Sequence, residues 1–205
     1  VQQAHADRHP RLDAIVPDAV QRILEQVELL RSIAGEFSLL GRPGELERAP
    51  VDLPPLVAEV TAGYAAEPGG GPRISIEPGP VPPVLAHRES LVKVLGNLMQ
   101  NSLDAAGAPG DLAVQVRWRV EPDAVTLVWS DNGPGIAADV AGRLFDPYFS
   151  TKSKGTGLGL AICRNLLDKM GGSITLADRD DTSGAVATVT LPRAWAAATA
   201  PEDDS

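Results

Sequence analysis

The segment DNGPGI, residues 131–136, directly follows the alternating run AVTLVWS, residues 124–130. An Asn-Gly step between two alternating strands usually marks a tight hairpin turn. The residues after Ile136 read AADVAGRLFDPYFSTKSKGTG, which shows no alternation of apolar and polar residues. The hairpin interpretation therefore fails. We expect instead that Asp131 ends a strand, and that the glycines and the proline turn the backbone away and leave its carboxylate facing a pocket.

The composition of the chain excludes several classes of protein. Its 205 residues are 43% hydrophobic, they carry a formal net charge of −9, and Cys163 is the single cysteine. A hydrophobic core is therefore expected, whereas an internal disulfide and a cysteine metal cluster are excluded. The negative charge argues against general affinity for nucleic acid or acidic membranes. With no recognisable signal peptide and no apolar run near the ~20 residues of a membrane span, we expect a cytoplasmic location, and any membrane attachment only through regions N-terminal to Val1.

Residues 12–41 are predicted to form one long helix, because Pro17 and Asp18 suit a first helical turn and Gly41 suits a stop. A narrow apolar seam with alternating spacings of four and three runs along it and comprises Val16, Val20, Ile23, Val27, Leu30, Ala34 and Phe37. Two interpretations stay open: a surface helix on its own domain, or a helix that packs on other helices in a bundle. The Pro-rich and charged stretch 41–55 predicts a domain boundary.

The rest of the chain alternates between helical and strand patterns. Helices are predicted at 53–67, 88–107 and 158–172, and strands at 73–79, 112–120, 124–130, 173–178 and 185–192. Strands joined by short loops favour antiparallel pairing. We therefore expect an α+β fold, a two-layer sandwich in which a mixed, mostly antiparallel sheet is covered by helices on one face. The last residues, 196–205, are predicted to be a disordered tail.

The predicted helix 88–107 carries a polar face. Asn97, Asn101 and Asp104 recur at i, i+4 and i+7, so they share a narrow arc. An adjacent arc is expected to face the core and comprises Leu91, Val94, Leu95, Leu98, Ser102 and Ala105. The polar arc is either an ordinary solvated face or a site for Mg²⁺, which takes oxygen ligands beside phosphates.

A glycine-rich loop precedes the helix predicted at 158–172. Gly155, Gly157 and Gly159 allow a close approach of the backbone, and a helix that begins after such a loop is a candidate anion site. Lys152 and Lys154 add local positive charge. The spacing fits neither a Rossmann fingerprint nor a P-loop, and a mere flexible connection is the alternative.

In order along the chain stand the paired-Asn helix, DNGPGI, FDPYFSTK at 145–152 and GTGLGLAI at 155–162. Together they resemble the N, G1, F and G2 boxes of the sensor histidine kinase catalytic domain, which has the Bergerat-type ATP fold of the GHKL superfamily shared with gyrase, MutL and Hsp90. The resemblance covers residues 51–192. The first helix is similar to the second helix of the kinase dimerisation region, in the style of NtrY-type nitrogen-regulation sensors. The resemblance as a whole implies a partial dimerisation region at 1–43 and a catalytic domain at 44–195.

The resemblance also implies roles for single residues. Asn101 is expected to coordinate Mg²⁺ that bridges the ATP phosphates, with Asn97 helping in catalysis on the same face. Asp131 is expected to hold the adenine amine, and residues 136–156 would form a lid over the nucleotide. The further residues expected at the nucleotide are Asp104, Gly133, Gly135, Ile136, Phe145, Lys152, Lys154, Gly155, Thr156, Gly157, Leu158, Gly159 and Thr188. Thr190 is the alternative to Thr188 as a lining residue of the adenine pocket.

The acceptor histidine of this family, followed by an acidic residue and Asn-Pro, is not found in the sequence. His5 and His9 are interpreted as turn residues. We therefore expect a fragment that donates the γ-phosphoryl group to a histidine outside it, labels itself negligibly, and serves a response regulator within a full-length homodimer. An ATP hydrolase of the MutL or Hsp90 kind is an alternative, disfavoured because the amide of Asn97 stands where those enzymes carry a glutamate base. A non-catalytic nucleotide-sensing module is another.

Overall fold

The computed structural model describes residues 20, 46–65, 71–152, 155–180 and 182–194. The chain divides into two compact units, Val1–Arg42 and Pro43–Ser205. The predictions for the first helix and for the C-terminal tail fall outside the described residues, Val20 apart. Within the described part, no helix is long and apolar enough to cross a membrane.

A five-stranded sheet forms one layer of the second unit, with the order β2-β4-β5-β7-β6. Its strands are β2 (Arg73–Ile76), β4 (Ala113–Val120), β5 (Ala124–Asp131), β6 (Ser173–Asp178) and β7 (Ala185–Pro192). Only the β2–β4 pair is parallel, and the other three pairs are antiparallel. The predicted mixed, mostly antiparallel sheet is confirmed.

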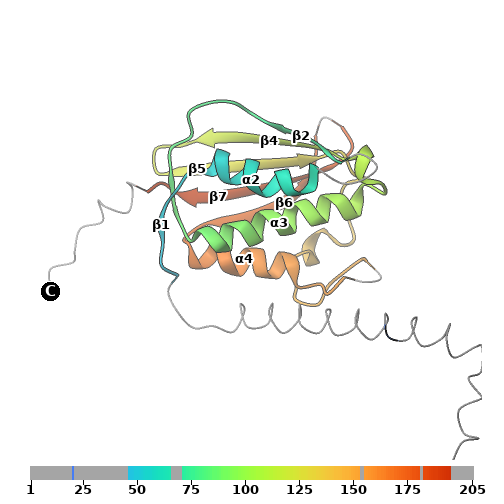
Figure 1. The fold of residues 1–205 in the computed structure, drawn as a ribbon. Helices are drawn as coiled ribbons and strands as arrows, with labels where there is room; N and C mark the ends of the chain where they lie inside the picture. The colour runs from blue at the N-terminus through green and yellow to red at the C-terminus, as the bar shows by residue number, and fades with distance from the viewer. Residues whose placement is uncertain (1–19, 21–45, 66–70, 153–154, 181, 195–205) are drawn as a thin grey trace, which may run out of the picture. The chain divides into compact units, whose positions relative to one another are not determined.

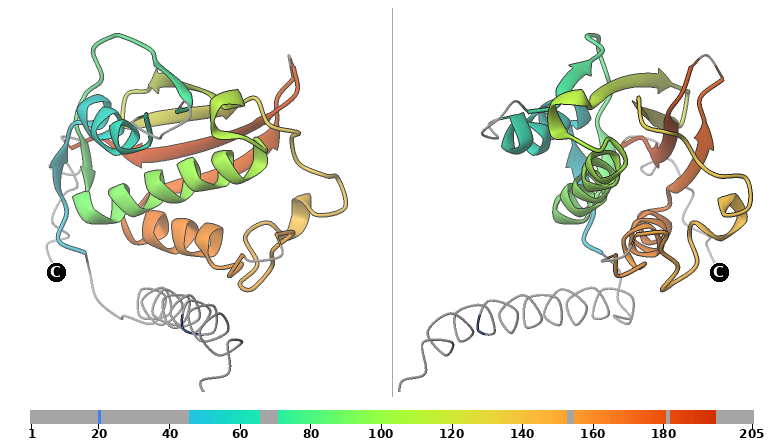
Figure 2. Two further views of the ribbon diagram at one scale, coloured as in Figure 1. Left: turned by 45° about the vertical axis from the view of Figure 1, so that its right-hand side comes forward. Right: turned by 90° about the vertical axis from the view of Figure 1, so that its right-hand side faces the viewer.

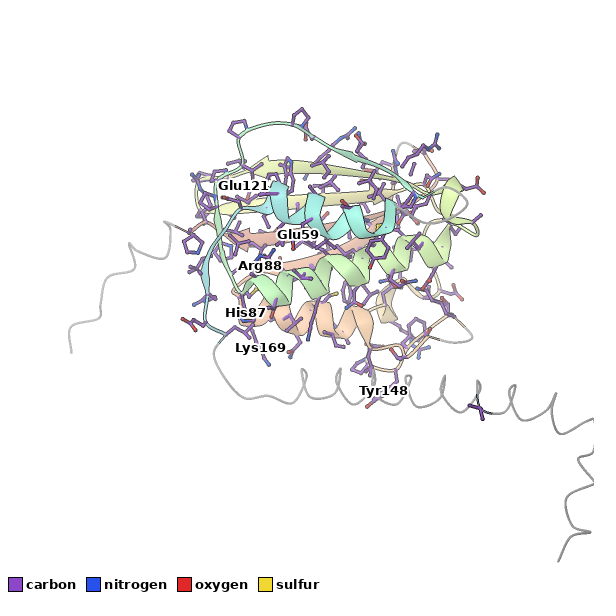
Figure 3. The ribbon with its side chains drawn as sticks, in the orientation of Figure 1. Glu59, His87, Arg88, Glu121, Tyr148 and Lys169 are labelled. Atoms are coloured by element: carbon purple, nitrogen blue, oxygen red, sulfur yellow. The ribbon has the colours of Figure 1, made fainter. Side chains whose placement is uncertain are left out.

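Three helices cover one face of this sheet (Figures 1 and 2). They are α2 (Leu53–Ala65), α3 (Arg88–Ala105) and α4 (Gly159–Lys169). The core lies between the layers, because alternate residues of the central strand, Val125, Leu127 and Trp129, are buried against them. Arg88 of α3 and Glu59 of α2 form an ion pair of 2.5 Å that joins these two helices at the surface (Figure 3).

The structure also contains a two-stranded sheet that the sequence analysis did not predict. It pairs β1 (Ala49–Val51) with β3 (Val84–Ala86) antiparallel, and a bridge from Val84 to Arg193 connects it to the end of β7. Each strand has three residues, which is too short for a visible alternation, and β1 falls within the stretch that was interpreted as a linker. The structure also adds two short 3₁₀ helices, Pro109–Asp111 and Ala141–Arg143.

Helix α3 positions the site. It begins after His87, whose Nδ1 accepts a hydrogen bond from the Ser90 backbone N–H. The predicted core arc is buried along most of the helix, from Leu91 to Ser102. Ala105 is an exception: it is exposed and lines a cavity at this end of the helix. The polar arc thus runs along a helix that is fixed to the sheet on its other side.

Candidate functional site

Asp131, the last residue of β5, is held by donors from three parts of the chain. Its side chain points toward the helical layer, with the residue only 7% exposed. Ser102 Oγ of α3 donates to Oδ2 at 3.0 Å, while the backbone N–H groups of Gly133 and Ala185 donate to Oδ1 at 3.0 and 3.1 Å. A carboxylate offers about four lone-pair positions. These three bonds therefore leave about one acceptor position, on Oδ2.

Ser102 belongs to a short chain of hydrogen bonds that sequence reasoning missed. Its hydroxyl accepts from the indole Nε1–H of Trp129 at 3.1 Å and donates to Asp131. Because the indole N–H is a donor only, it fixes the direction of the Ser102 hydroxyl. Both residues are buried. A lone serine on the apolar arc of a helix looks like a small core residue, so the sequence carried no signal for this role.

A cavity of about 310 Å³ lies beside this end of the site. It is lined by Ala105, Ala106, Asp111, Asn132, Gly133 and Pro134. The Asp131 side chain is not among the lining residues. The sequence predicted that this carboxylate faces a pocket; in the structure Asp131 is buried, and its oxygens accept hydrogen bonds from Ser102 and from two backbone amides.

The turn after β5 is shaped by Gly135 and Asp178. Gly135 has a φ of +87°, and a Cβ there would lie 2.6 Å from Asp178 Oδ1. The same carboxylate oxygen accepts the backbone N–H of Ile136 at 2.6 Å. A glycine is therefore required at position 135 for two reasons: the backbone is left-handed, and Asp178 lies too close for a side chain. At this contact the chain leaves the sheet and enters the lid. The missing alternation after Ile136 had indicated that no second hairpin strand follows.

At the other end of the site, a lid lysine contacts the polar arc of α3. Lys152 Nζ donates to Asn101 Oδ1 at 2.9 Å and to Asp104 Oδ2 at 2.6 Å. Gln100 Nε2 donates to the second oxygen of Asp104 at 2.7 Å. The side chains of Lys152 and Asp104 are 37% and 34% exposed. Lys154 lies outside the described residues.

Asn97 joins the polar arc of α3 to the start of α4. Its Nδ2 donates to the Gly159 carbonyl at 3.4 Å, and a Cβ on Gly159 would lie 3.3 Å from Asn97 Oδ1. Cys163 lies beside it. Burial raises the pKa of the Cys163 thiol to about 12, and a hydrogen bond with the Asn97 side chain offsets only part of that rise. Cys163 is fully buried, so the thiol form is favoured in the interior beside Asn97.

The loop before α4 presents backbone donors. Gly157 has a φ of +69°, and a Cβ there would collide with the backbone of Tyr148 and Phe149. Leu158 is fully buried, makes no side-chain cap, and its N–H donates to Thr156 Oγ1 at 3.3 Å. With Gly155, these residues bring the loop to the N-terminus of α4, where first-turn N–H groups and the helix dipole favour an anion.

Arginines contact the rings of both phenylalanines of the lid. Arg164 of α4 donates from Nη2 to the Phe145 carbonyl at 2.7 Å, and its guanidinium lies 4.7 Å from the centre of the Phe145 ring. Arg143 lies 4.3 Å from the centre of the Phe149 ring. Tyr148 between them is 65% exposed and lies at the periphery of the unit (Figure 3). Phe145 thus ties the lid to α4.

Thr188 does not join the site. It pairs with Val128 of β5, whereas the neighbouring pair Trp129–Ala187 is buried against the helices. Paired residues share a face of the sheet and alternate along the strand. Thr188 and Thr190 therefore lie on the face opposite to Asp131, where Thr190 Oγ1 is 3.0 Å from Thr126 Oγ1. The prediction that Thr188 lines the adenine pocket is wrong, and Ala185 contributes the contact from β7 instead.

Residues 86–194 match the family described as histidine kinase-, DNA gyrase B-, and HSP90-like ATPase. This match covers more than half of the 205 residues. The chain belongs to this ATPase family. It is 33% identical to the C4-dicarboxylate transport sensor protein DctB of Rhizobium meliloti (strain 1021) over 178 residues, which are 85% of this chain and 28% of DctB.

Two further similar proteins indicate to which type of protein within the ATPase family the chain is similar. The chain is 30% identical to the signal transduction histidine-protein kinase AtoS of Escherichia coli (strain K12) over 190 residues, 90% of this chain and 30% of AtoS. Full-length ShkA, solved in complex with AMPPNP, is similar with a TM-score of 0.68 at 26% identity, over 82% of this chain and 36% of ShkA. The chain thus spans about a third or less of these proteins. It carries an ATP-binding catalytic domain of the histidine kinase type, as the four motifs predicted, while the likeness to NtrY-type sensors stays a prediction.

Proposed function

We propose that this domain binds Mg·ATP between Asp131 and the start of α4, and that it donates the γ-phosphoryl group to a histidine on a separate helix. The observation that carries the proposal is the position of two adjacent residues of α3. Ser102 bonds to Asp131, while Asn101 lies at the polar arc beside the lid. One rigid helix therefore connects a buried acceptor for a base amine with oxygen ligands suited to a cation.

The adenine end acts through the open acceptor position on Asp131. A buried carboxylate held by three donors cannot reorient, so an exocyclic amine is the group that it accepts. Guanine presents a carbonyl oxygen at the corresponding position of its ring, which the carboxylate repels. Selectivity follows because a buried polar group that loses its partner costs about 1–3 kcal/mol.

The phosphate end combines backbone donors, a lysine and amide oxygens. First-turn N–H groups of α4, reached over Gly157 and Gly159, are suited to phosphate oxygens. The oxygens of Asn101 and Asp104 fit a cation, because the Lys152 ammonium lies against both of them. Within the described residues, no three His, Cys, Asp or Glu side chains form a metal site, which suits an ion that takes further ligands from phosphates. When bound there by Asn101, with Asn97 on the same face of α3, Mg²⁺ would neutralise phosphate charge.

The side chains favour transfer over hydrolysis. The Asn97 amide cannot take a proton from water at neutral pH. Asp104, the nearest carboxylate on the same arc, has its oxygens bonded to Gln100 and Lys152. The domain would therefore act by positioning and electrostatic stabilisation of phosphoryl transfer to a better nucleophile. The acceptor helix, a downstream response regulator and a homodimer of the full-length protein are the partners that this activity requires.

Titration calorimetry with ATP and GTP, each with and without Mg²⁺, tests the binding part of this proposal. We expect binding of ATP, weaker binding of GTP and enhancement by Mg²⁺. Asn101→Ala should abolish the Mg²⁺ enhancement and leave Mg²⁺-independent binding, because the fold of α3 does not depend on this partly exposed amide. Lys93→Met, on the same helix but exposed elsewhere, is the control. Full Mg²⁺ enhancement in Asn101→Ala would place the cation elsewhere.

Phosphoryl transfer needs its own assay. The chain is mixed with γ-labelled ATP and a separately made helical hairpin that bears an acceptor histidine from the same full-length protein. We expect labelled hairpin, no label when its histidine is changed to alanine, and little free phosphate. Steady release of phosphate by the chain alone would favour an ATP hydrolase. Binding of ATP without transfer to this hairpin would favour a nucleotide-sensing module.

A further inference from the structure

Lys152 forms a contact that links the lid to the cation side of the site. Its ammonium group lies 2.9 Å from Asn101 Oδ1 and 2.6 Å from Asp104 Oδ2, across 51 and 48 residues of sequence. Its own backbone N–H donates to Ser150 Oγ at 3.0 Å, a local bond within the lid. The two contacts with α3 are therefore long-range bonds, made to the helix that the proposed function assigns to Mg²⁺.

The Lys152 ammonium and a metal ion would compete for Asn101. An amide oxygen that accepts an N–H bond from an ammonium group at 2.9 Å is a poorer ligand for Mg²⁺, because the two cations repel at that distance. Mg²⁺ also demands near-ideal octahedral geometry, which a neighbouring ammonium group crowds. A metal at Asn101 is therefore favoured when Lys152 leaves the Asn101 oxygen.

Asp104 is placed to hold Lys152. Gln100 donates to Asp104 Oδ1 and so orients the carboxylate, which leaves Oδ2 for the ammonium. Asp104 lies one turn beyond Asn101 on α3, and its side chain is about one-third exposed. The geometry gives Asp104 a lysine partner instead of the place among the nucleotide-binding residues that the family resemblance implied.

We propose that Lys152 is an internal counter-cation that latches the lid to α3, that it would give up Asn101 to a Mg²⁺ ion bound with the nucleotide, and that Asp104 is a positioning residue for Lys152 rather than a metal ligand. This inference rests on the proposed function and adds a coupling to it. Cation binding at Asn101 releases the lid, and the freed ammonium becomes available to phosphate oxygens. The lid thereby responds to the metal as well as to the nucleotide.

The latch itself is tested without nucleotide, by hydrogen exchange of the lid amides. Lys152→Met and Asp104→Asn should each raise the exchange rate of residues 144–152 about threefold, as expected for a partly exposed ion pair, and the double variant should add little. High salt should shrink the difference. Lys93→Met, which removes an exposed lysine of α3, should change nothing. Unchanged lid exchange in both single variants would overturn the latch whatever the chain does with ATP.

The displacement is tested by the Mg²⁺ enhancement, the ratio of ATP affinities with Mg²⁺ and with a chelator. If Asp104 only holds Lys152, Asp104→Asn raises this ratio about threefold, because Mg²⁺ then meets a weaker competitor. If Asp104 is a metal ligand, the ratio falls, and the proposal is overturned. A wild-type chain that shows no ATP binding, or no enhancement, contradicts the proposed function instead. The exchange experiment still decides the latch in that case.

Discussion

The two ends of the site are built differently, although adjacent residues of one helix reach them. Ser102 faces Asp131, which is 7% exposed and bonded to donors from α3, from the turn after β5 and from the start of β7. Asn101 faces the lid, where Lys152 and Asp104 are each about one-third exposed. The Asp131 end, which we propose recognises the base, is a buried hydrogen-bond network, whereas the Asn101 end, which we propose binds the cation, is a partly solvated ion pair.

This difference has an energetic consequence. Breaking a buried hydrogen bond to a charged group costs about 1.5–3 kcal/mol, whereas a solvated ion pair contributes about 0–1 kcal/mol. The Asp131 end is therefore fixed before a ligand arrives, while the Lys152 end can exchange one cation for another. In the proposed function, selectivity for the base would therefore rest on the fold, and the response to the ligand would rest on the lid.

The largest effect is expected for the reactivity of the Cys163 thiol. This residue is buried next to the partly solvated end of the site. Burial raises the pKa of its thiol to about 12 from an ordinary value of 9.0. The thiol form is thus favoured in the folded chain, so this contribution to stability is full below about pH 9 and is lost as the pH rises through about 12. At mildly alkaline pH the thiolate fraction should be roughly a thousandfold lower than in the unfolded chain. Alkylation rates in native buffer and in concentrated urea check this.

Fast alkylation of the native chain would show that water reaches the interior behind Asn97. The control is the same measurement on a small free thiol in both solvents, which corrects for the effect of urea on the reagent.

Asp131→Asn should weaken ATP binding about a hundredfold, since it removes a charged acceptor from a buried network and introduces an unmatched donor. Calorimetry should show the loss together with a smaller preference of ATP over GTP. Asp139→Asn, an exposed substitution of the same kind in the lid, is the matched control and should bind normally. Equal ATP affinity in Asp131→Asn and the control would remove the base-recognition role of this residue.

Gly157→Ala should weaken ATP binding about tenfold, because a side chain at positive φ costs about 1–2 kcal/mol and the added methyl group meets the lid backbone. The melting temperature should fall by a few degrees as well, because the strain lies in the folded chain next to the buried Leu158. Gly142→Ala is the matched control: it is also in the lid, and a Cβ there meets nothing within 4 Å. Parallel losses of affinity in both variants would mean that the lid, rather than this backbone conformation, is at fault.

Ser102→Ala should weaken ATP binding about fivefold, because it leaves the Trp129 indole N–H and one Asp131 oxygen without a partner, at about 1 kcal/mol. Ser90→Ala, another buried serine of α3 but at its far end, is the control. Measured affinities and melting curves of both variants separate loss of the site from loss of the fold. An ATP affinity of Ser102→Ala equal to that of the control would make the Ser102 bond structural only.

Sequence patterns predicted the larger elements because each element contains several repeats of its pattern. The alternation in β5 and β7 and the arcs of α3 follow directly from two-residue and 3.6-residue repeats. Strands of three residues, such as β1, carry too few repeats to be seen. The failed hairpin after Asp131 was informative because the following residues lacked a second alternation.

The side-chain partners were less accessible to prediction. Alternation places Thr188 and Asp131 each on one face of a strand, but only the register of β5 against β7 shows that the two faces are opposite. The Ser102–Asp131 and Lys152–Asp104 contacts span 29 and 48 residues, so no local spacing reveals them. The residue types of the site were therefore predictable, and their pairing was not.

A crystal structure of this chain with Mg²⁺ and a non-hydrolysable ATP analogue tests the contrast between the two ends most directly. We predict that the hydrogen bonds of Asp131 to Ser102, Gly133 and Ala185 are unchanged and that the adenine amine contacts Asp131 Oδ2. Mg²⁺ is predicted at Asn101, with the Lys152 ammonium moved from Asn101 to the phosphates. A base bound away from Asp131, or a metal that coordinates Asp104 while Lys152 keeps its contact with Asn101, would contradict the account.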